Sequence, residues 1–279
     1  TKNSVTTHYR TGKYENYELS VNLLKHLGAN YIRTDFFWGY IYLDQEYNFS
    51  KYDQWVNKLK EDVPNIKILG ILNSSASIVG NDKKIDTEEE LKGFVEFCIN
   101  VAKHYPEIEN YQILNEPNSI YVTSEDIEWY DRIIEEASTA LKEINPDIEI
   151  TQYSLSAGTN DTNTYLSSKT FYEKAFNNKI YSLSDSFSYN IYYDLESKIQ
   201  THKDQFNDFG GFIKQDITEY GTSTYNGMSE EMQANQIIIQ ANQLEEKNIA
   251  LKNIYNFWNT GTDLEDKSQN YGLLRNDYT

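Results

Sequence analysis

Two glutamates stand near the ends of strand-like segments that lie far apart in the chain. Glu116 follows the apolar run of "NYQILNEPN" (110–118), and Glu219 falls in "DITEYG" (216–221). Reactive groups of α/β folds gather at the carboxyl ends of parallel strands. Two carboxyl groups roughly 5 Å apart suit hydrolysis of a glycosidic bond, one as nucleophile and the other as proton donor. We therefore expect Glu116 and Glu219 to form a catalytic pair.

The proline after Glu116 indicates how that glutamate is presented. Pro117 disfavours the α region for the preceding residue, so we expect Glu116 to be extended, with its carboxylate at the strand's end. The competing interpretation is that both glutamates are ordinary surface residues in a chain with 43 Asp and Glu. That interpretation explains either glutamate alone more readily than both of them at strand ends.

The rest of the sequence alternates strand-like and helix-like segments, which predicts the elements that would hold the two glutamates. Strands are expected at 4–9, 30–38, 66–73, within 110–118, and at 148–155, 186–193, 211–221 and 251–258. Helical periodicity falls between them, at 17–28, 50–62, 91–105, 124–144, 163–177, 197–208 and 229–248. Seven β-then-α units and an eighth strand favour a (β/α)8 barrel over an open sheet. We expect its closing helix to be short or missing.

In such a ring the fourth and seventh strands are expected to face each other across the mouth. Their terminal carboxylates, Glu116 and Glu219, would then flank one bound sugar. No linker rich in Pro, Gly or Ser and no shift in composition divides the chain. We therefore expect a single catalytic domain over residues 1–279.

The composition limits the partners. A formal net charge of −18 at pH 7 argues against nucleic acid and anionic membranes, because both would be repelled. No apolar run is long enough to cross a membrane, so no membrane insertion is expected. The 24 tyrosines offer flat apolar faces with polar tips, which suit sugar rings. We expect a monomer with a carbohydrate substrate. The chain begins at Thr1 without methionine, as a trimmed chain or a mature secreted form would, and we expect an extracellular or cell-envelope location.

Sequence motifs for other chemistries are absent. Cys98 is the only cysteine, which excludes a disulfide framework and a thiolate metal site. The chain has no H-E-x-x-H, calcium loop, P-loop, G-x-G-x-x-G or G-x-S-x-G motif. We therefore expect neither a metal nor a cofactor.

The motif Asn115-Glu116-Pro117 and the distant Glu219 resemble the paired acids of clan A glycoside hydrolases. The resemblance implies a retaining double displacement in which Glu116 is the acid/base and Glu219 is the nucleophile. Within the clan, "VTTHY", "LLKHLGANYIRTDFFWGYI", "YNFSKYDQWVNKLK" and "IKILGIL" resemble family 39, especially its bacterial exopolysaccharide-hydrolase branch. The resemblance covers nearly the whole chain. The chain departs from it in the closing helix and in "YIYLDQEYNF", where relatives often carry a glutamate after the tryptophan.

Three polar side chains are expected beside the pair. The resemblance implies that Arg33 hydrogen-bonds the nucleophile and keeps it charged, although a purely structural ion pair would also hold a buried arginine. Asn115 would donate to the sugar 2-hydroxyl or steady the glycosyl-enzyme, or else cap the strand end. Tyr192 would offer its hydroxyl to Glu219, but alternation alone does not distinguish it from Tyr193.

Four further residues are expected to contact the substrate. Trp258, at the end of the eighth strand, would be a flat platform under the sugar, with a core position as the alternative. His8 on the first strand would meet a sugar hydroxyl. Asp35 and Trp38 follow Arg33 toward the same strand end and are weaker candidates.

Two functions of other classes are also compatible with a barrel. A glycan-binding barrel that has lost catalysis would not need Glu116, Glu219 and Arg33 to be intact, so their presence argues against it. An enolising or lyase-type enzyme would commonly need lysine, histidine or a metal at the strand ends. The strand ends here offer carboxylate, amide and aromatic groups instead.

Overall fold

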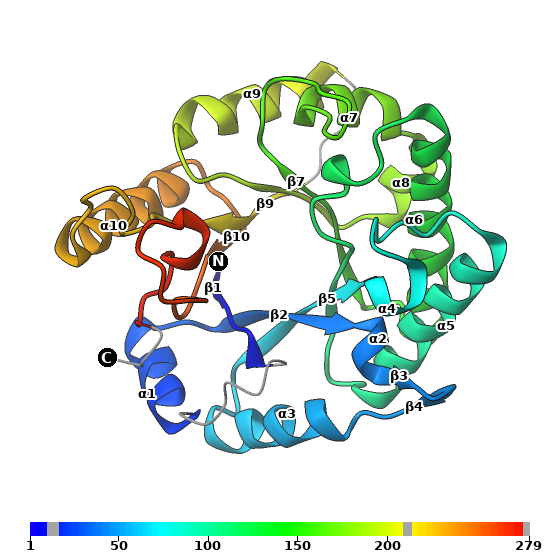
Figure 1. The fold of residues 1–279 in the computed structure, drawn as a ribbon, viewed down its shortest axis with the longest axis horizontal. Coiled ribbons are helices and arrows are strands. Elements are labelled where there is room, and N and C mark those ends of the chain that lie inside the picture. The colour runs from blue at the N-terminus through cyan, green and yellow to red at the C-terminus, as the bar shows by residue number, and fades with distance from the viewer. Residues whose placement is uncertain (10–16, 209–213, 276–279) are drawn as a thin grey trace.

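The computed structural model describes residues 1–9, 17–208 and 214–275, and it shows a closed barrel of eight parallel strands (Figure 1). The strands are β1 (Lys2–Thr6), β2 (Tyr31–Phe37), β5 (Lys67–Asn73), β6 (Asn110–Ile113), β7 (Glu149–Ser156), β8 (Ser186–Asn190), β9 (Lys214–Tyr220) and β10 (Leu251–Ile254). Around the ring they follow the order β1-β10-β9-β8-β7-β6-β5-β2. The predicted (β/α)8 fold is confirmed. Residues 211–213 of the expected seventh strand lie outside the described residues.

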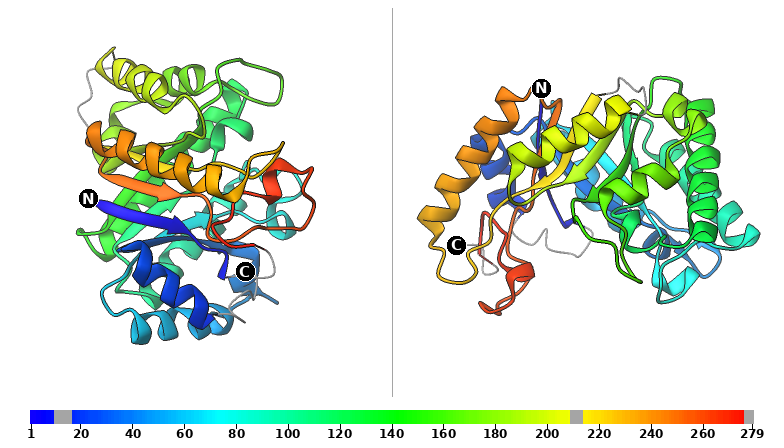
Figure 2. Two further views of the ribbon diagram at one scale, coloured as in Figure 1. Left: turned by 90° about the vertical axis from the view of Figure 1, so that its left-hand side faces the viewer. Right: turned by 90° about the horizontal axis from the view of Figure 1, so that it is seen from above.

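Helices surround the strands on the outside of the ring, and Figure 2 shows them from two further sides. The longer ones are α1 (Tyr17–Leu27), α3 (Ser50–Asp62), α5 (Glu88–His104), α6 (Ser124–Ile144), α7 (Ser168–Ala175), α9 (Leu195–Asp208) and α10 (Glu230–Glu246). Shorter helices are α2 (Trp38–Ile41), α4 (Ala76–Val79) and α8 (Asn178–Leu183), and a small hairpin pairs β3 (Tyr42–Leu43) with β4 (Glu46–Tyr47).

Local sequence signals explain where α6 begins and which face it buries. Thr123 and Asp126 form a capping box, in which each side chain accepts a hydrogen bond from the other residue's backbone N–H. Ile127, Tyr130 and Ile134 recur at helical spacing and are buried against the barrel. The cap fixes the start of the helix, and the apolar stripe fixes its rotation.

Alternation along β2 sends its side chains to the two sides of the barrel wall. Phe36 packs outward on Tyr52 and Trp55 of α3, with ring centroids 5.0 and 6.2 Å away. Arg33 and Asp35 have the opposite parity, and both line a cavity at the mouth of the barrel. The strand's period of two therefore brings polar groups to the inside of the barrel.

The chain after β10 folds over the mouth of the barrel instead of forming an outer helix. We call residues 255–275 the closing segment; its only helix among the described residues is the short η4 (Lys267–Gln269). It is tied to the loop after β9 by the bond from Thr224 N to Asn270 O, 3.0 Å long. It is tied to β1 by the bond from Phe257 N to Thr6 O, 3.1 Å long. The expectation of a short or missing closing helix is met over these residues.

None of the helices within residues 1–9, 17–208 and 214–275 combines the length and the apolar character that crossing a bilayer requires.

Candidate active site

Glu116 and Glu219 line one cavity, which we call the central cavity. Its volume is about 370 Å³, and it opens at the carboxyl ends of the barrel strands. Glu219 lies near the end of β9, and Glu116 lies three residues beyond β6. In the ring only β7 and β8 lie between β6 and β9, so the strands that carry the two glutamates are three positions apart around the barrel. The expectation that these strands face each other directly was therefore inaccurate.

The backbone at Glu116 is not extended, contrary to the prediction made from Pro117. Glu116 has φ 47° and ψ 51°, in the left-handed region, and Leu114 also has a positive φ of 60°. The strand ends at Ile113, and Pro117 opens a 3₁₀ turn, η3 (Pro117–Ser119). Proline disfavours the right-handed region for its predecessor, but it leaves the left-handed one available when neighbouring bonds hold it.

A hydrogen bond to the adjacent strand holds this backbone conformation. Glu116 N donates to Ser154 O on β7 at 3.2 Å. Ser154 itself has a φ of 43°, at an irregularity in the pairing of β7 with β8. Left-handed residues other than glycine cost of order 1–3 kcal/mol each and persist where the surroundings fix them. The position of the Glu116 carboxylate is thus set by a strained turn.

Two donors hold Glu219 from different sides. Arg33, on β2, places Nη1 2.9 Å from Glu219 Oε1, and only 1% of the arginine side chain is exposed. The hydroxyl of Tyr192 donates to the other carboxylate oxygen. Tyr193 is 62% exposed, so the structure distinguishes the two tyrosines that alternation could not. Glu219 therefore has a fixed positive charge beside one oxygen and a hydroxyl donor on the other.

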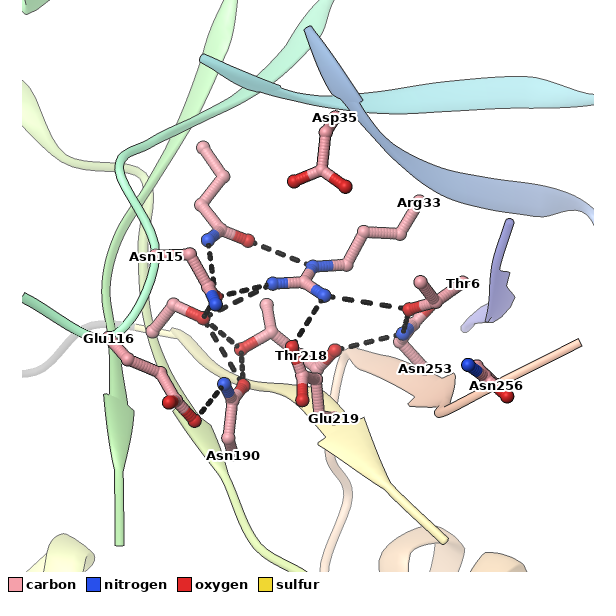
Figure 3. Close-up of polar contacts among 12 residues, drawn as sticks. Thr6, Arg33, Asp35, Asn115, Glu116, Asn190, Thr218, Glu219, Asn253 and Asn256 are labelled. Atoms are coloured by element: carbon pink, nitrogen blue, oxygen red, sulfur yellow. Dashed lines mark hydrogen bonds and ion pairs between the residues drawn. The ribbon is translucent and has the colours of Figure 1, made fainter. Parts of the chain in front are cut away.

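Glu116 has different surroundings. Its Oε1 accepts a 2.9 Å hydrogen bond from Asn190 Nδ2 on β8, and no cation contacts it among the described residues (Figure 3). Burial raises the pKa of Glu116 to about 7, and the negative charge of Glu219 adds to the effect. The bond from Asn190 opposes the rise, because it favours the charged form. Near neutral pH Glu116 can therefore both give and take a proton.

A buried network joins the two carboxylates (Figure 3). Ser154 Oγ lies within 3.5 Å of polar atoms of Arg33, Asn115, Asn190 and Thr218. Thr218 donates to Asn190 Oδ1 at 2.9 Å, which turns the amide nitrogen of Asn190 toward Glu116. Asn115 Oδ1 accepts from Arg33 Nη2 at 2.8 Å, which leaves the amide nitrogen of Asn115 for the cavity. Ser154 thus contacts one hydrogen-bond partner of each glutamate, Arg33 beside Glu219 and Asn190 beside Glu116.

His8 and Asp35 also line the central cavity. His8 Nδ1 lies 3.9 Å from Asp35 Oδ2, and Asn256 Nδ2 lies 3.3 Å from His8 Nε2. Asn73 donates to Asp35 at 2.7 Å. These contacts fix a polar edge of the cavity.

Trp38 and Trp258 do not lie where the sequence suggested. Trp38 is 4% exposed and packs on Phe94 and Phe97 of α5, because the chain turns into α2 at this residue. The missing side chain of Gly93 leaves room for its indole ring, which would come within 2.7 Å of a Cβ there. Trp38 and Trp258 are both core residues.

Trp258 is 2% exposed and packs on Tyr9, with ring centroids 5.8 Å apart. Strand β10 ends at Ile254, four residues earlier than the predicted end, so Trp258 lies in the closing segment and does not line the central cavity. Its ring leaves no face free for a sugar. The aromatic residues that line the central cavity from the closing segment are Tyr255 and Tyr271.

Sequence reasoning missed Asn190, Tyr255 and Tyr271. Asn190 ends β8, and Tyr255 directly follows β10, so a correct strand boundary would have singled out both. No sequence signal indicates Tyr271, because it reaches the cavity through the fold of the closing segment. In the part of the chain that the structure describes, no three His, Cys, Asp or Glu side chains converge as metal ligands would.

No protein-family model matches the chain, and no curated protein matches it in sequence. Solved structures match its fold. A family 39 glycoside hydrolase from Bacteroides cellulosilyticus WH2 superposes with a TM-score of 0.76 at 17% identity, over 100% of this chain and 60% of that chain. A monomeric beta-xylosidase from Caulobacter crescentus CB15 gives 0.72 at 15% identity, over 99% and 65%.

A third match is the family 39 enzyme from Xanthomonas axonopodis pv. citri, with a TM-score of 0.70 at 14% identity, over 99% of this chain and 63% of that chain. The chain thus spans about 60 to 65% of the length of these proteins. At such identities the likeness shows the fold. The chain shares the (β/α)8 barrel of family 39 glycoside hydrolases, the family that its sequence resembles.

Proposed function

We propose that the protein is a retaining glycoside hydrolase acting on an oligosaccharide or polysaccharide. One observation carries the proposal: two carboxyl groups line a single cavity, and their surroundings differ. Glu219 has the guanidinium of Arg33 beside it, whereas Glu116 has a pKa of about 7. A nucleophile needs a charged carboxylate, and a general acid needs a proton near neutral pH. The fold shared with family 39 enzymes supports the same assignment.

In the first step Glu219 attacks the anomeric carbon, and the bond to the leaving oxygen breaks. Glu116 gives its proton to that oxygen, and a covalent glycosyl-enzyme forms. In the second step Glu116, now a carboxylate, takes a proton from water while the water oxygen attacks the anomeric carbon. Glu219 departs as a carboxylate and Glu116 is protonated again, so both residues return to their starting states.

Neighbouring side chains support these steps. Arg33 and the hydroxyl of Tyr192 hold Glu219 in place from two directions, which limits the orientations it can adopt. Asn115, with its oxygen occupied by Arg33, would turn its amide nitrogen to the sugar 2-hydroxyl. We further propose that residues 1–279 are one catalytic domain, monomeric and extracellular or in the cell envelope, where such substrates occur.

The decisive experiment compares Glu219→Ala with Glu230→Ala, an exposed glutamate on α10 that pairs with Arg275. A panel of 4-nitrophenyl glycosides and bacterial polysaccharides is scored by released nitrophenol and product size. Loss of a covalent nucleophile should lower kcat by more than about 10³-fold, while Glu230→Ala retains wild-type rates. Full activity of Glu219→Ala would refute the assignment.

Two further readouts test the finer points. The anomer released in the first minutes, followed by proton NMR, should have the configuration of the substrate; an inverted anomer would exclude double displacement. Calorimetric binding of a glycan by the wild-type protein with no bond cleavage would identify a non-catalytic glycan-binding barrel instead.

A further inference from the structure

A second cavity lies directly beside the central one. We call it the side cavity; its volume is about 390 Å³, within the range of small-molecule sites. The loop after β9, at residues 221–228, forms one wall, and Tyr193, Met232 and Lys267 complete it. Tyr192 and Tyr271 line both cavities. The two cavities therefore share a wall.

The shared wall is a cluster of tyrosine rings. The ring of Tyr271 lies 5.0 Å from that of Tyr192 and 5.9 Å from that of Tyr255, between centroids. Tyr192 donates its hydroxyl to Glu219, so the residue that borders the side cavity also touches the proposed nucleophile. A ligand that fills both cavities would pass this cluster next to the reacting bond.

The side cavity collects exposed apolar surface. Ten large hydrophobic side chains are exposed in the described part of the chain, and three of them line this cavity: Tyr193, Tyr225 and Met232. Their exposed fractions are 62%, 36% and 54%. Lys198 Nζ lies 3.7 Å from the ring centre of Tyr193 and so covers one face of it. Contiguous exposed apolar surface is a feature of ligand-binding grooves, whereas single exposed apolar side chains are normal.

Hydrogen bonds hold the walls of the side cavity in place. Ser223 Oγ donates to Lys267 O at 3.0 Å, and Thr224 N donates to Asn270 O at 3.0 Å. Gln233 Nε2 donates to Thr222 O at 2.8 Å from α10. The loop is therefore fixed on both sides, and a ligand would meet a preformed surface.

We propose that the side cavity binds a neutral sugar unit of the same glycan whose scissile unit occupies the central cavity. The inference rests on the proposed glycosidase function and narrows it, because the substrate is then a chain of at least two sugar units. Tyrosine rings offer flat faces to sugar C–H groups, and hydroxyl and backbone groups offer hydrogen bonds. Lys267 is the one charged residue among the described residues that line the cavity, and its single positive charge does not offset the chain's net charge of −18, which disfavours a polyanionic unit.

The test uses Tyr225→Ala, Tyr225→Phe and a control, Tyr40→Ala. Tyr40 is 48% exposed on α2 and lines neither cavity. For each variant kcat/KM is measured on 4-nitrophenyl β-xyloside and β-xylobioside, and on the corresponding glucoside and cellobioside. The ratio of bioside to monoside should fall about tenfold in Tyr225→Ala, which corresponds to about 1.4 kcal/mol. It should stay at the wild-type value in Tyr225→Phe and Tyr40→Ala, because both keep the ring of Tyr225.

A binding experiment separates this inference from the proposed function. Xylotetraose, cellotetraose and mannotetraose are titrated into Glu219→Gln and into Glu219→Gln/Tyr225→Ala, and Kd is measured by calorimetry. A roughly tenfold weaker Kd in the double variant supports the side cavity even if the wild-type protein cleaves nothing. Normal turnover with unchanged ratios and Kd values leaves the glycosidase intact and overturns the side cavity as a sugar site. Failure of all three tetraoses to bind overturns it as well.

Discussion

Replacing Glu116 with glutamine should stabilise the fold at alkaline pH and not at acidic pH. Burial and the charge of Glu219 raise the pKa of Glu116 from 4.5 to about 7. The folded state therefore binds this proton more tightly than the unfolded state does. Stability that the wild-type protein has below pH 4.5 is lost as pH rises toward 7, because the buried carboxyl must then carry a charge. Glutamine carries no charge at any pH.

The magnitude follows from the same two values. At 1.36 kcal/mol per pH unit, the interval between 4.5 and about 7 corresponds to roughly 3 kcal/mol. The advantage of Glu116→Gln over the wild type should thus grow by about 3 kcal/mol between pH 4 and pH 8. In a chain of 279 residues this corresponds to a gain in Tm of about 6 °C. Glutamine retains an oxygen that can accept the bond from Asn190.

Urea unfolding at pH 4, 6 and 8 measures the difference directly. Asp131→Asn is a matched control, because burial also raises the pKa of Asp131 to about 7 and this residue lies on α6 outside the central cavity. Both variants should gain stability with pH, and only Glu116→Gln should lose activity. A Glu116→Gln advantage that is independent of pH, or that shrinks as pH rises, would refute the reasoning.

Four further predictions concern the residues of the site and its surroundings. The alkaline limb of the kcat/KM profile should lie near pH 7. Asn190→Ala should move this limb to higher pH, because it removes an amide donor that favours the charged form of Glu116. Rates measured between pH 4 and 9 that show an unmoved limb would contradict this. Glu116→Ala should keep the first step on 2,4-dinitrophenyl glycosides, whose leaving group needs no proton, and show a burst, while 4-methoxyphenyl glycosides slow by about 10³-fold; equal slowing of both would argue against an acid role. Arg33→Met should lower the unfolding free energy by about 3–5 kcal/mol, because Glu219 is left buried without its cationic partner; urea titration measures this loss. Trp258→Phe should leave KM unchanged, which initial rates measure.

Alternation and helical periodicity were sufficient to predict the barrel. Residues of opposite parity on β2 pack on α3 or line the central cavity, so a period of two already separates Phe36 from Arg33. The placement of Glu116 and Glu219 on one cavity was also accessible, because each glutamate stands near the end of a strand-like segment. Alternation, helical periodicity and the position of a residue near a strand end are set by neighbouring residues, so they can be predicted from short stretches of sequence.

The remaining features depend on where hydrogen bonding stops and on which strands become neighbours. Trp258 was assigned to the mouth because apolar residues continue past Ile254, although pairing has already ended there. Asn190 was missed because its value lies in facing Glu116 from another strand. The conformation of Glu116 is set by a bond to Ser154, 38 residues along the chain, which no dipeptide rule contains.

The closing segment (255–275) affects local unfolding of the barrel. It supplies Tyr255 to one cavity, Lys267 to the other and Tyr271 to both, and it also bonds across the seam where β1 meets β10. If this segment unfolds locally, the central cavity and the side cavity both lose part of their walls. A glycan bound across both cavities would hold this segment against the junction of β1 and β10. Amide exchange of residues in the segment would then slow on binding, at positions away from the reacting bond.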